Sequence, residues 1–170
     1  MNKIISHWVI ILGLTLALPG CKMGYSFTGA SIPPEAKTVS VAFFANNTAI
    51  APPTISQSFT EALKDICANQ TNLSLVNKGG DLSFEGVISD YRVTPLAIQT
   101  NDQAALNRLT ISIQVKYANK FDEKKNFETV VQQYADFNST QSLSAVEQTL
   151  IPIINKKLVE DIFNKAFSNW

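Results

Sequence analysis

The chain contains 170 residues, which is enough for one ordinary domain. Lys plus Arg and Asp plus Glu each number 14, and this charge balance excludes the basic field that a nucleic-acid-binding domain needs. A hydrophobic content of 45% excludes a disordered chain and a multi-span membrane protein. Charged residues make up only 16% of the chain, and we interpret this polar but weakly charged composition as suited to lasting contact with another protein.

Residues 1–20 are predicted to form a secretory signal peptide. Lys3 precedes the apolar run Trp8–Leu18, which is too short to cross a hydrocarbon core that takes about 20 residues. The run leads into Leu18-Pro19-Gly20-Cys21, which resembles a bacterial lipobox, so we expect Cys21 to become the acylated N-terminus of the mature protein. The alternative is an ordinary signal peptide that ends near a cysteine by chance. Stable anchoring requires more than one acyl chain, and bacterial lipoproteins carry several.

The residues after Cys21 bear on sorting and on domain organisation. Lys22, in place of an Asp, favours the outer membrane, and the absence of an acidic run favours its periplasmic face. Glycines and prolines between residues 22 and 36 indicate an extended linker. We therefore divide the chain into the signal peptide, a lipidated N-terminus and linker over residues 21–36, and a single domain over residues 37–170.

The predicted mature chain lacks the residues of most catalytic sites. Removal of the signal peptide removes His7, the single histidine, and this excludes Ser-His-Asp and Cys-His catalysis and every histidine-containing metal site. Cys67 falls on the apolar face of a predicted helix, so we expect a buried packing role instead of a reactive thiol. Gly79-Gly80-Asp81 is interpreted as a turn, and Asp81 with Glu85 or Asp90 as solvated positions instead of an acid–base pair. We expect a protein that is not an enzyme and needs no cofactor.

The first half of the domain predicts a strand, a helix and two further strands. Thr38–Phe44 is predicted to be a central strand. A capping box of Thr54 and Gln57 would open a helix that ends near residues 68–70 and buries Ile55, Phe59, Leu63, Ile66 and Cys67.

The two further strands are Leu73–Val76 and Asp81–Thr94. In the longer one the apolar phase changes, so we expect a twist or bulge near Gly86. Leu82, Phe84 and Ile88 would share one face, and Val87, Tyr91 and Val93 the other.

The second half predicts a hairpin and a long helix. Residues 106–119 alternate cleanly between apolar and polar side chains, and a turn at Asp122–Asn126 leads to a partner strand over Phe127–Asn138. A capping box of Ser144 and Glu147 would begin an amphipathic helix that contains Pro152. Its apolar stripe is expected to comprise Ile151, Ile154, Leu158, Val159, Ile162, Phe163, Ala166, Phe167 and Trp170.

The expected element order is β-α-β-β-β-β-α. Because a βαβ unit makes a right-handed crossover, its two strands should be parallel, and the hairpins should then extend the sheet in antiparallel fashion. We predict an α/β (α+β) two-layer sandwich, a mixed sheet with both helices on one face and a polar face on the other side.

Several short motifs resemble the LptE family of lipopolysaccharide-assembly lipoproteins. They are Cys21, Gly24-Tyr25-Ser26-Phe27, Lys37-Thr38-Val39-Ser40-Val41 with Phe43-Phe44 and Asn46-Asn47, and the C-terminal Asp161-Ile162-Phe163 with Trp170. The resemblance implies a non-catalytic outer-membrane lipoprotein that plugs the β-barrel translocon LptD, helps it assemble and assists lipopolysaccharide delivery. It also implies lipopolysaccharide contact through basic residues, for which Arg92, Arg108 and Lys116 are candidates.

The polar side of the 106–119 strand, centred on Ser112, Gln114 and Lys116, is our candidate partner surface. It combines strong alternation with few charges, and a barrel wall could satisfy its hydrogen-bonding groups. The alternative function is a lipoprotein subunit of an outer-membrane secretion pore or ring, which would use the 106–138 hairpin to insert in the membrane. A soluble ligand-binding lipoprotein is a third and more distant possibility.

Overall fold

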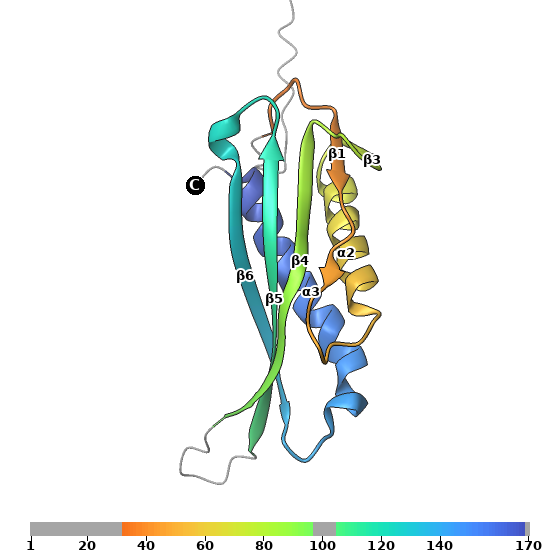
Figure 1. Cartoon of the computed structure of the whole chain (residues 1–170), viewed down its shortest axis with the longest axis vertical. Coiled ribbons are helices and arrows are strands. Elements are labelled where there is room, and N and C mark those ends of the chain that lie inside the picture. The colour runs from red at the N-terminus through yellow and green to blue at the C-terminus, as the bar shows by residue number, and fades with distance from the viewer. Residues whose placement is uncertain (1–31, 97–104, 169–170) are drawn as a thin grey trace, which may run out of the picture.

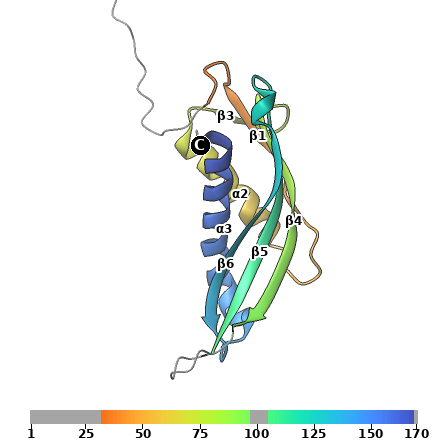
Figure 2. The ribbon, with the colours of Figure 1, turned by 90° about the vertical axis from the view of Figure 1, so that its left-hand side faces the viewer.

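The computed structural model describes residues 32–96 and 105–168 of the chain. In this part, helices α2 (Ile55–Gln70) and α3 (Leu143–Phe167) pack on a six-stranded mixed sheet. Figure 2 views the sheet from its side and shows both helices on the same face. The predicted two-layer α+β arrangement is therefore confirmed. None of the helices among the described residues is long and apolar enough to cross a membrane.

The strands follow the predicted order, with one short strand added. The sheet order is β3-β1-β4-β5-β6, and β2 pairs with β4 beyond the end of β1 (Figure 1). β1 is parallel to β3 and to β4, whereas β4, β5 and β6 form antiparallel pairs, as the βαβ and hairpin patterns predicted. The strands are β1 (Thr38–Val41), β2 (Ala45–Asn46), β3 (Ser74–Val76), β4 (Leu82–Pro95), β5 (Leu106–Asn119) and β6 (Phe127–Asn138).

The prediction of one continuous strand over residues 38–44 is wrong. The chain leaves the ladder after Val41 and rejoins β4 at Ala45, which pairs with Val87. Phe44 is the reason, because its fully buried ring packs edge-to-face on Phe59 at 5.0 Å between ring centroids. The backbone N–H of Phe44 donates to Thr60 Oγ1 at 3.1 Å instead of to a neighbouring strand. Packing on α2 thus interrupts a sequence that has good strand propensity.

The bulge of β4 lies at Ser89, three residues after the predicted Gly86. Ile88 pairs with Ile113 and Asp90 with Ser112, so Ser89 is the extra residue in the register. The bulge brings Tyr91 to the same helix-covered face as Ile88, where it is 3% exposed. The expected grouping of Val87, Tyr91 and Val93 on one face is therefore wrong, because Val93 also packs against this core while Val87 stays opposite Gln114.

Gly86 instead allows β5 and the Phe44 ring to approach the β4 backbone closely. A Cβ at this position would clash with the backbone oxygen of Gln114 and would lie 2.6 Å from Cε1 of Phe44. A glycine is therefore what allows Phe44 to lie against β4 at this point of the sheet.

Neither predicted capping box forms. The side chain of Thr54 makes no cap hydrogen bond, and Gln57 donates to Glu61 at 2.9 Å. Ser144 lies inside α3, whose N-cap is Ser142. Glu147 instead accepts a hydrogen bond from the Tyr91 hydroxyl at 3.2 Å, a contact between helix and sheet that no local pattern encodes.

The core lies between the helix layer and the sheet, and the predicted apolar stripes of both helices face it. On α2 four of the five predicted residues are fully buried, and Ile66 is partly buried. On α3 every predicted residue from Ile151 to Phe167 is buried, whereas Trp170 lies outside the described residues. Burial raises the pKa of the Cys67 thiol to about 12, so it stays protonated at neutral pH and its predicted packing role is confirmed.

Candidate interaction surface on the sheet

The face of the sheet that lies away from the helices, here called the outer face, carries all five predicted contact residues of the domain. The pairing of three long strands brings them together, because alternate residues of β4, β5 and β6 point to this side. The outer face comprises Glu85, Val87, Asp90, Arg92 and Thr94 of β4, Arg108, Thr110, Ser112, Gln114 and Lys116 of β5, and Glu128, Val130, Gln132, Tyr134 and Asp136 of β6.

The centre of the outer face is a hydrogen-bonded network. Ser112 lies between Asp90 and Gln132 in the register, and its hydroxyl donates to Gln132 Oε1 at 3.4 Å. Arg92 donates to the same oxygen at 3.2 Å and forms an ion pair with Asp90. These long side chains cover Ser112, which is only 4% exposed although no helix lies over it. Ser112 thus supports the long side chains that cover it.

Arg108 is held by two neighbours on β6. Its guanidinium donates to both carboxylate oxygens of Asp136, at 2.7 and 2.9 Å, and lies 3.6 Å from the centroid of the Tyr134 ring. The hydrogen bond between them raises the pKa of Arg108 and lowers the pKa of Asp136 below its ordinary value. Both groups are therefore charged at neutral pH and their geometry is fixed.

The other end of the outer face combines amide and charged groups. Gln114 donates to Glu128 at 2.9 Å, and both side chains are exposed. In the strand register Lys116 lies opposite Glu85 on β4 and opposite Glu128 on β6. Opposite charges on adjacent strands stabilise a sheet modestly, so this arrangement favours the observed register.

The outer face is balanced in charge instead of basic. Arg92 and Arg108 form ion pairs with Asp90 and Asp136, so an anionic ligand would have to compete with carboxylates for the two arginines, and Lys116 lies between Glu85 and Glu128 in the register. Arg108 lies on β5 between β4 and β6, whereas Arg92 lies on the part of β4 beyond Ile88, where β5 is its only paired strand among the described residues. The sequence pattern places Tyr134 with Val130 on one side of β6, but the predicted contact residues did not include Tyr134 or Gln132, although the hairpin turn at 122–126 and the alternation of β5 could have brought both to the polar side of the sheet.

The carboxylates considered for acid–base chemistry do not form such a site. Asp81 accepts hydrogen bonds from the backbone N–H groups of Lys37 and Thr38 and from the Thr38 hydroxyl, and these bonds lower its pKa. It therefore joins the start of β1 to β4. Across residues 32–96 and 105–168 no group of three or more His, Cys, Asp or Glu side chains could hold a metal ion.

The described residues therefore form a two-layer α+β domain with one sheet face that no helix covers and whose side chains are hydrogen-bonded to one another. The model of the LptE family, described as lipopolysaccharide-assembly, matches residues 36–166, and the chain belongs to this family. Membership makes it one of the non-catalytic lipoproteins of lipopolysaccharide assembly, as the sequence motifs indicated. No curated protein sequence matches the chain.

Several solved structures are similar to the chain at very low sequence identity. The hypothetical protein CT253 from Chlamydia trachomatis has 9% identity and a TM-score of 0.51, covering 77% of this chain and 98% of that protein. Rare lipoprotein B from Shewanella oneidensis has 9% identity and a TM-score of 0.49, covering 76% and 90%. A minor lipoprotein from Acinetobacter baumannii has 14% identity and a TM-score of 0.48, covering 76% and 91%. At this level the likeness to CT253 concerns the fold alone.

Proposed function

We propose that this protein is a lipid-anchored component of the outer membrane that plugs an LptD-like β-barrel, helps it assemble and thereby assists lipopolysaccharide delivery. Membership of the LptE family indicates lipopolysaccharide assembly as the process, and we propose the outer face as the surface that contacts the barrel. The observation that carries the proposal is that this broad face of three long strands is polar, balanced in charge and free of helices.

The lumen of a large outer-membrane barrel is polar, so a plug must offer hydrogen-bonding groups without leaving buried ones unpaired. The outer face meets this requirement because its arginines, amides and hydroxyls already satisfy one another across strands. Val130 and Tyr134 are 60% and 42% exposed, and they add apolar area that a barrel wall could cover. A surface that is organised before binding loses little side-chain entropy when it docks.

The anchor and the sorting of the protein rest on residues outside the described part of the chain. We propose that residues 1–20 are removed and that Cys21 carries the lipid, which would tether the domain at the periplasmic face of the outer membrane. Intact-mass measurement of the membrane-extracted protein should give a chain that begins at Cys21 and carries diacylglycerol. The Cys21→Ala variant should leave the membrane fraction, and a wild-type protein that begins at another residue would contradict the anchor.

Arg92, Arg108 and Lys116 remain the proposed lipopolysaccharide contacts. A phosphate group of lipopolysaccharide offers the acceptor oxygens that Asp90 and Asp136 now supply, so binding would be an exchange of partners at each arginine. Because such an exchange gains little net charge interaction, we expect weak binding that salt reduces further.

Photocrosslinking in living cells tests the plug. Gln114 is the better position for a photoreactive residue, because it is exposed whereas Ser112 is covered by its neighbours. Ile153 on the solvent side of α3, 46% exposed, is the matched control in the other layer. Crosslinks from position 114 and not from 153 to a large outer-membrane barrel would support the proposal. Crosslinks to other copies alone would support the pore-ring alternative, and the absence of any crosslink from 114 would contradict a docked outer face.

A further inference from the structure

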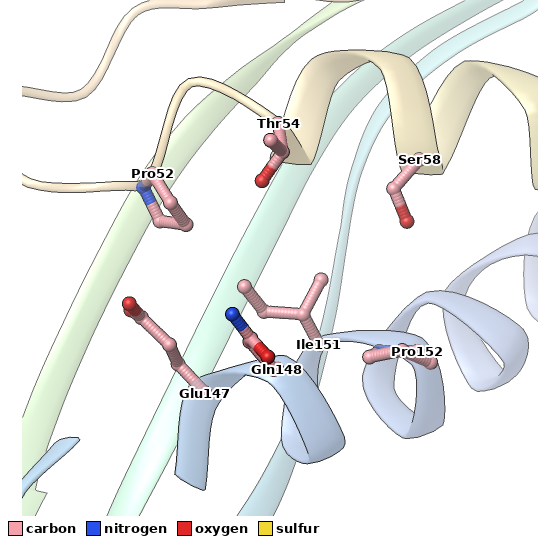
Figure 3. Close-up of a pocket in the computed structure, with 7 residues that line it drawn as sticks. All are labelled: Pro52, Thr54, Ser58, Glu147, Gln148, Ile151 and Pro152. Atoms are coloured by element: carbon pink, nitrogen blue, oxygen red, sulfur yellow. The ribbon is translucent and has the colours of Figure 1, made fainter. Parts of the chain in front are cut away.

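A groove runs along the junction of α2 and α3, on the layer opposite the outer face. It consists of two adjoining hollows of about 320 and 350 Å³, which share Ser58 and Pro152. Figure 3 shows the first hollow, where Pro52, Thr54 and Ser58 face Glu147, Gln148 and Ile151 across the gap. The second hollow continues between the helices as far as Gln70 and Glu160. We call this feature the α2–α3 groove.

Asn155 lines the second hollow with an unsatisfied acceptor. Asn155 is only 2% exposed, and its side-chain Nδ2 group donates to Ser58 Oγ at 3.0 Å. Its Oδ1 atom has no hydrogen-bond partner within the described part of the chain. A buried acceptor without a partner is unfavourable, and most such atoms in folded proteins are satisfied. Because the Oδ1 atom is shielded from solvent although Asn155 lines the second hollow, a donor that satisfies it has to enter the hollow and displace the side chains that cover the atom.

Pro152 lies where the two hollows meet, and it affects a second acceptor, the backbone carbonyl oxygen of Gln148. It lies inside α3 and has no N–H, so it cannot supply the helical hydrogen bond to the carbonyl oxygen of Gln148, four residues earlier. Both Gln148 and Pro152 line the first hollow (Figure 3). One backbone hydrogen bond of α3 is therefore missing beside the α2–α3 groove.

The charges and apolar groups of the groove are complementary to a basic side chain with an aliphatic stem. Asp65 and Glu160 line the second hollow and Glu147 the first, against the single cation Lys156 among the lining residues. Ala62, Ile66 and Val159 provide an apolar strip in the second hollow. Excess carboxylates, an unpaired amide oxygen and an apolar strip together favour a ligand that is cationic, rich in donors and partly apolar.

We propose that the α2–α3 groove docks a peptide segment of a partner protein that carries an arginine flanked by apolar residues. The guanidinium has five N–H donors in a planar fork, so it can satisfy Asn155 Oδ1 and a carboxylate together, which a compact ammonium does less well. Its methylene stem lies along Ala62, Ile66 and Val159. This site is distinct from the proposed barrel contact, because the helices and the outer face form opposite layers of the domain (Figure 2).

The test uses the full lipid-anchored chain in detergent, labelled for NMR, with acetyl-Leu-Arg-Leu-amide as the probe and acetyl-Leu-Glu-Leu-amide as the control. Addition of the arginine peptide should shift the side-chain amide signals of Asn155 and the backbone signals of Ala62 and Val159, in a saturable manner. The glutamate peptide should shift none of these signals. Equal shifts with both peptides, or no shift with the arginine peptide, would overturn the proposal.

Substitutions on the two helices separate recognition of the peptide from effects on the fold. Asn155→Leu removes the unpaired acceptor and should weaken the arginine peptide at least tenfold, as read from Ala62 and Val159, while Asn164→Leu at an exposed position of the same helix should leave binding unchanged. If Asn155→Leu disturbs the fold, the exposed pair Asp65→Lys and Glu160→Lys gives an independent reading. Unaltered affinity in the charge-reversed variant would contradict the assigned role of the carboxylates.

Discussion

Strand β5 has buried side chains on both of its faces, but different kinds of side chain cover them. On the helix-covered face, Ile111 and Ile113 are fully buried by hydrocarbon packing, whereas on the outer face Thr110 and Ser112 are each 4% exposed beneath arginine, glutamine and tyrosine side chains. Low exposure alone therefore does not identify the core of this domain. The first surface depends on filled volume, and the second depends on polar contacts that another molecule can replace.

Truncation of the helix-covered face should have the largest effect. Leu158 and Ile162 of α3 are fully buried, so Leu158→Ala or Ile162→Ala should lower the free energy of unfolding by about 2–5 kcal/mol through lost packing and a residual cavity. Ile153→Ala, on the exposed side of the same helix, should cost under about 0.5 kcal/mol. Urea unfolding followed by circular dichroism measures both. Similar small losses at all three positions would mean that α3 contributes little to the core.

Gly86→Ala should have an intermediate effect, because it tests how closely β4, β5 and Phe44 approach one another. A Cβ at position 86 would clash with the Gln114 backbone and lie 2.6 Å from the Phe44 ring, so we expect a loss of about 1–3 kcal/mol in the free energy of unfolding. Glu85→Ala, at the preceding and exposed position on the outer face, is the control and should be nearly neutral. Equal melting temperatures for the two variants would show that the sheet can adjust without cost.

Removal of the Arg108–Asp136 pair on the outer face should have the smallest effect. Because the side chain of Asp136 is 31% exposed, Asp136→Asn should cost under about 1 kcal/mol at pH 7. The folded-state pKa of Asp136 is lowered, so its contribution is present above the unfolded pKa of about 3.9 and is lost as the pH falls through the folded value. Unfolding measured at neutral pH and near pH 2.5 should therefore show a difference that disappears in acid, whereas a difference that grows in acid would contradict the pairing.

Local pattern was sufficient for most of the fold. The alternation of β5, the helical spacing of α2 and α3 and the β-α-β-β-β-β-α order predicted the two layers, the mixed sheet and the side on which each predicted residue of β5 lies. These features depend on the period of side chains along one element, which the sequence contains directly. The family assignment from short motifs was confirmed, and the motifs between Lys37 and Phe163 lie within the matched residues 36–166, whereas Cys21, Gly24-Tyr25-Ser26-Phe27 and Trp170 lie outside them.

Features that need two distant segments could not be predicted. The interruption after Val41 follows from Phe44 packing on Phe59, and the failed capping boxes follow in part from Tyr91 binding Glu147 across the layers. The bulge at Ser89 required a register with β5, which fixes which residue is extra.

The amino-acid sequence by itself determined the order of the two helices and the long strands, the apolar face of each helix and the family, because these depend on local periodicity and short motifs. Only the tertiary structure decided that the outer face satisfies its own charges across three strands and that Asn155 keeps an unpaired oxygen beside a groove. The physical reason is that hydrogen bonds and close contacts depend on distances of a few ångströms between residues far apart in the chain, and strand pairing and helix packing set those distances.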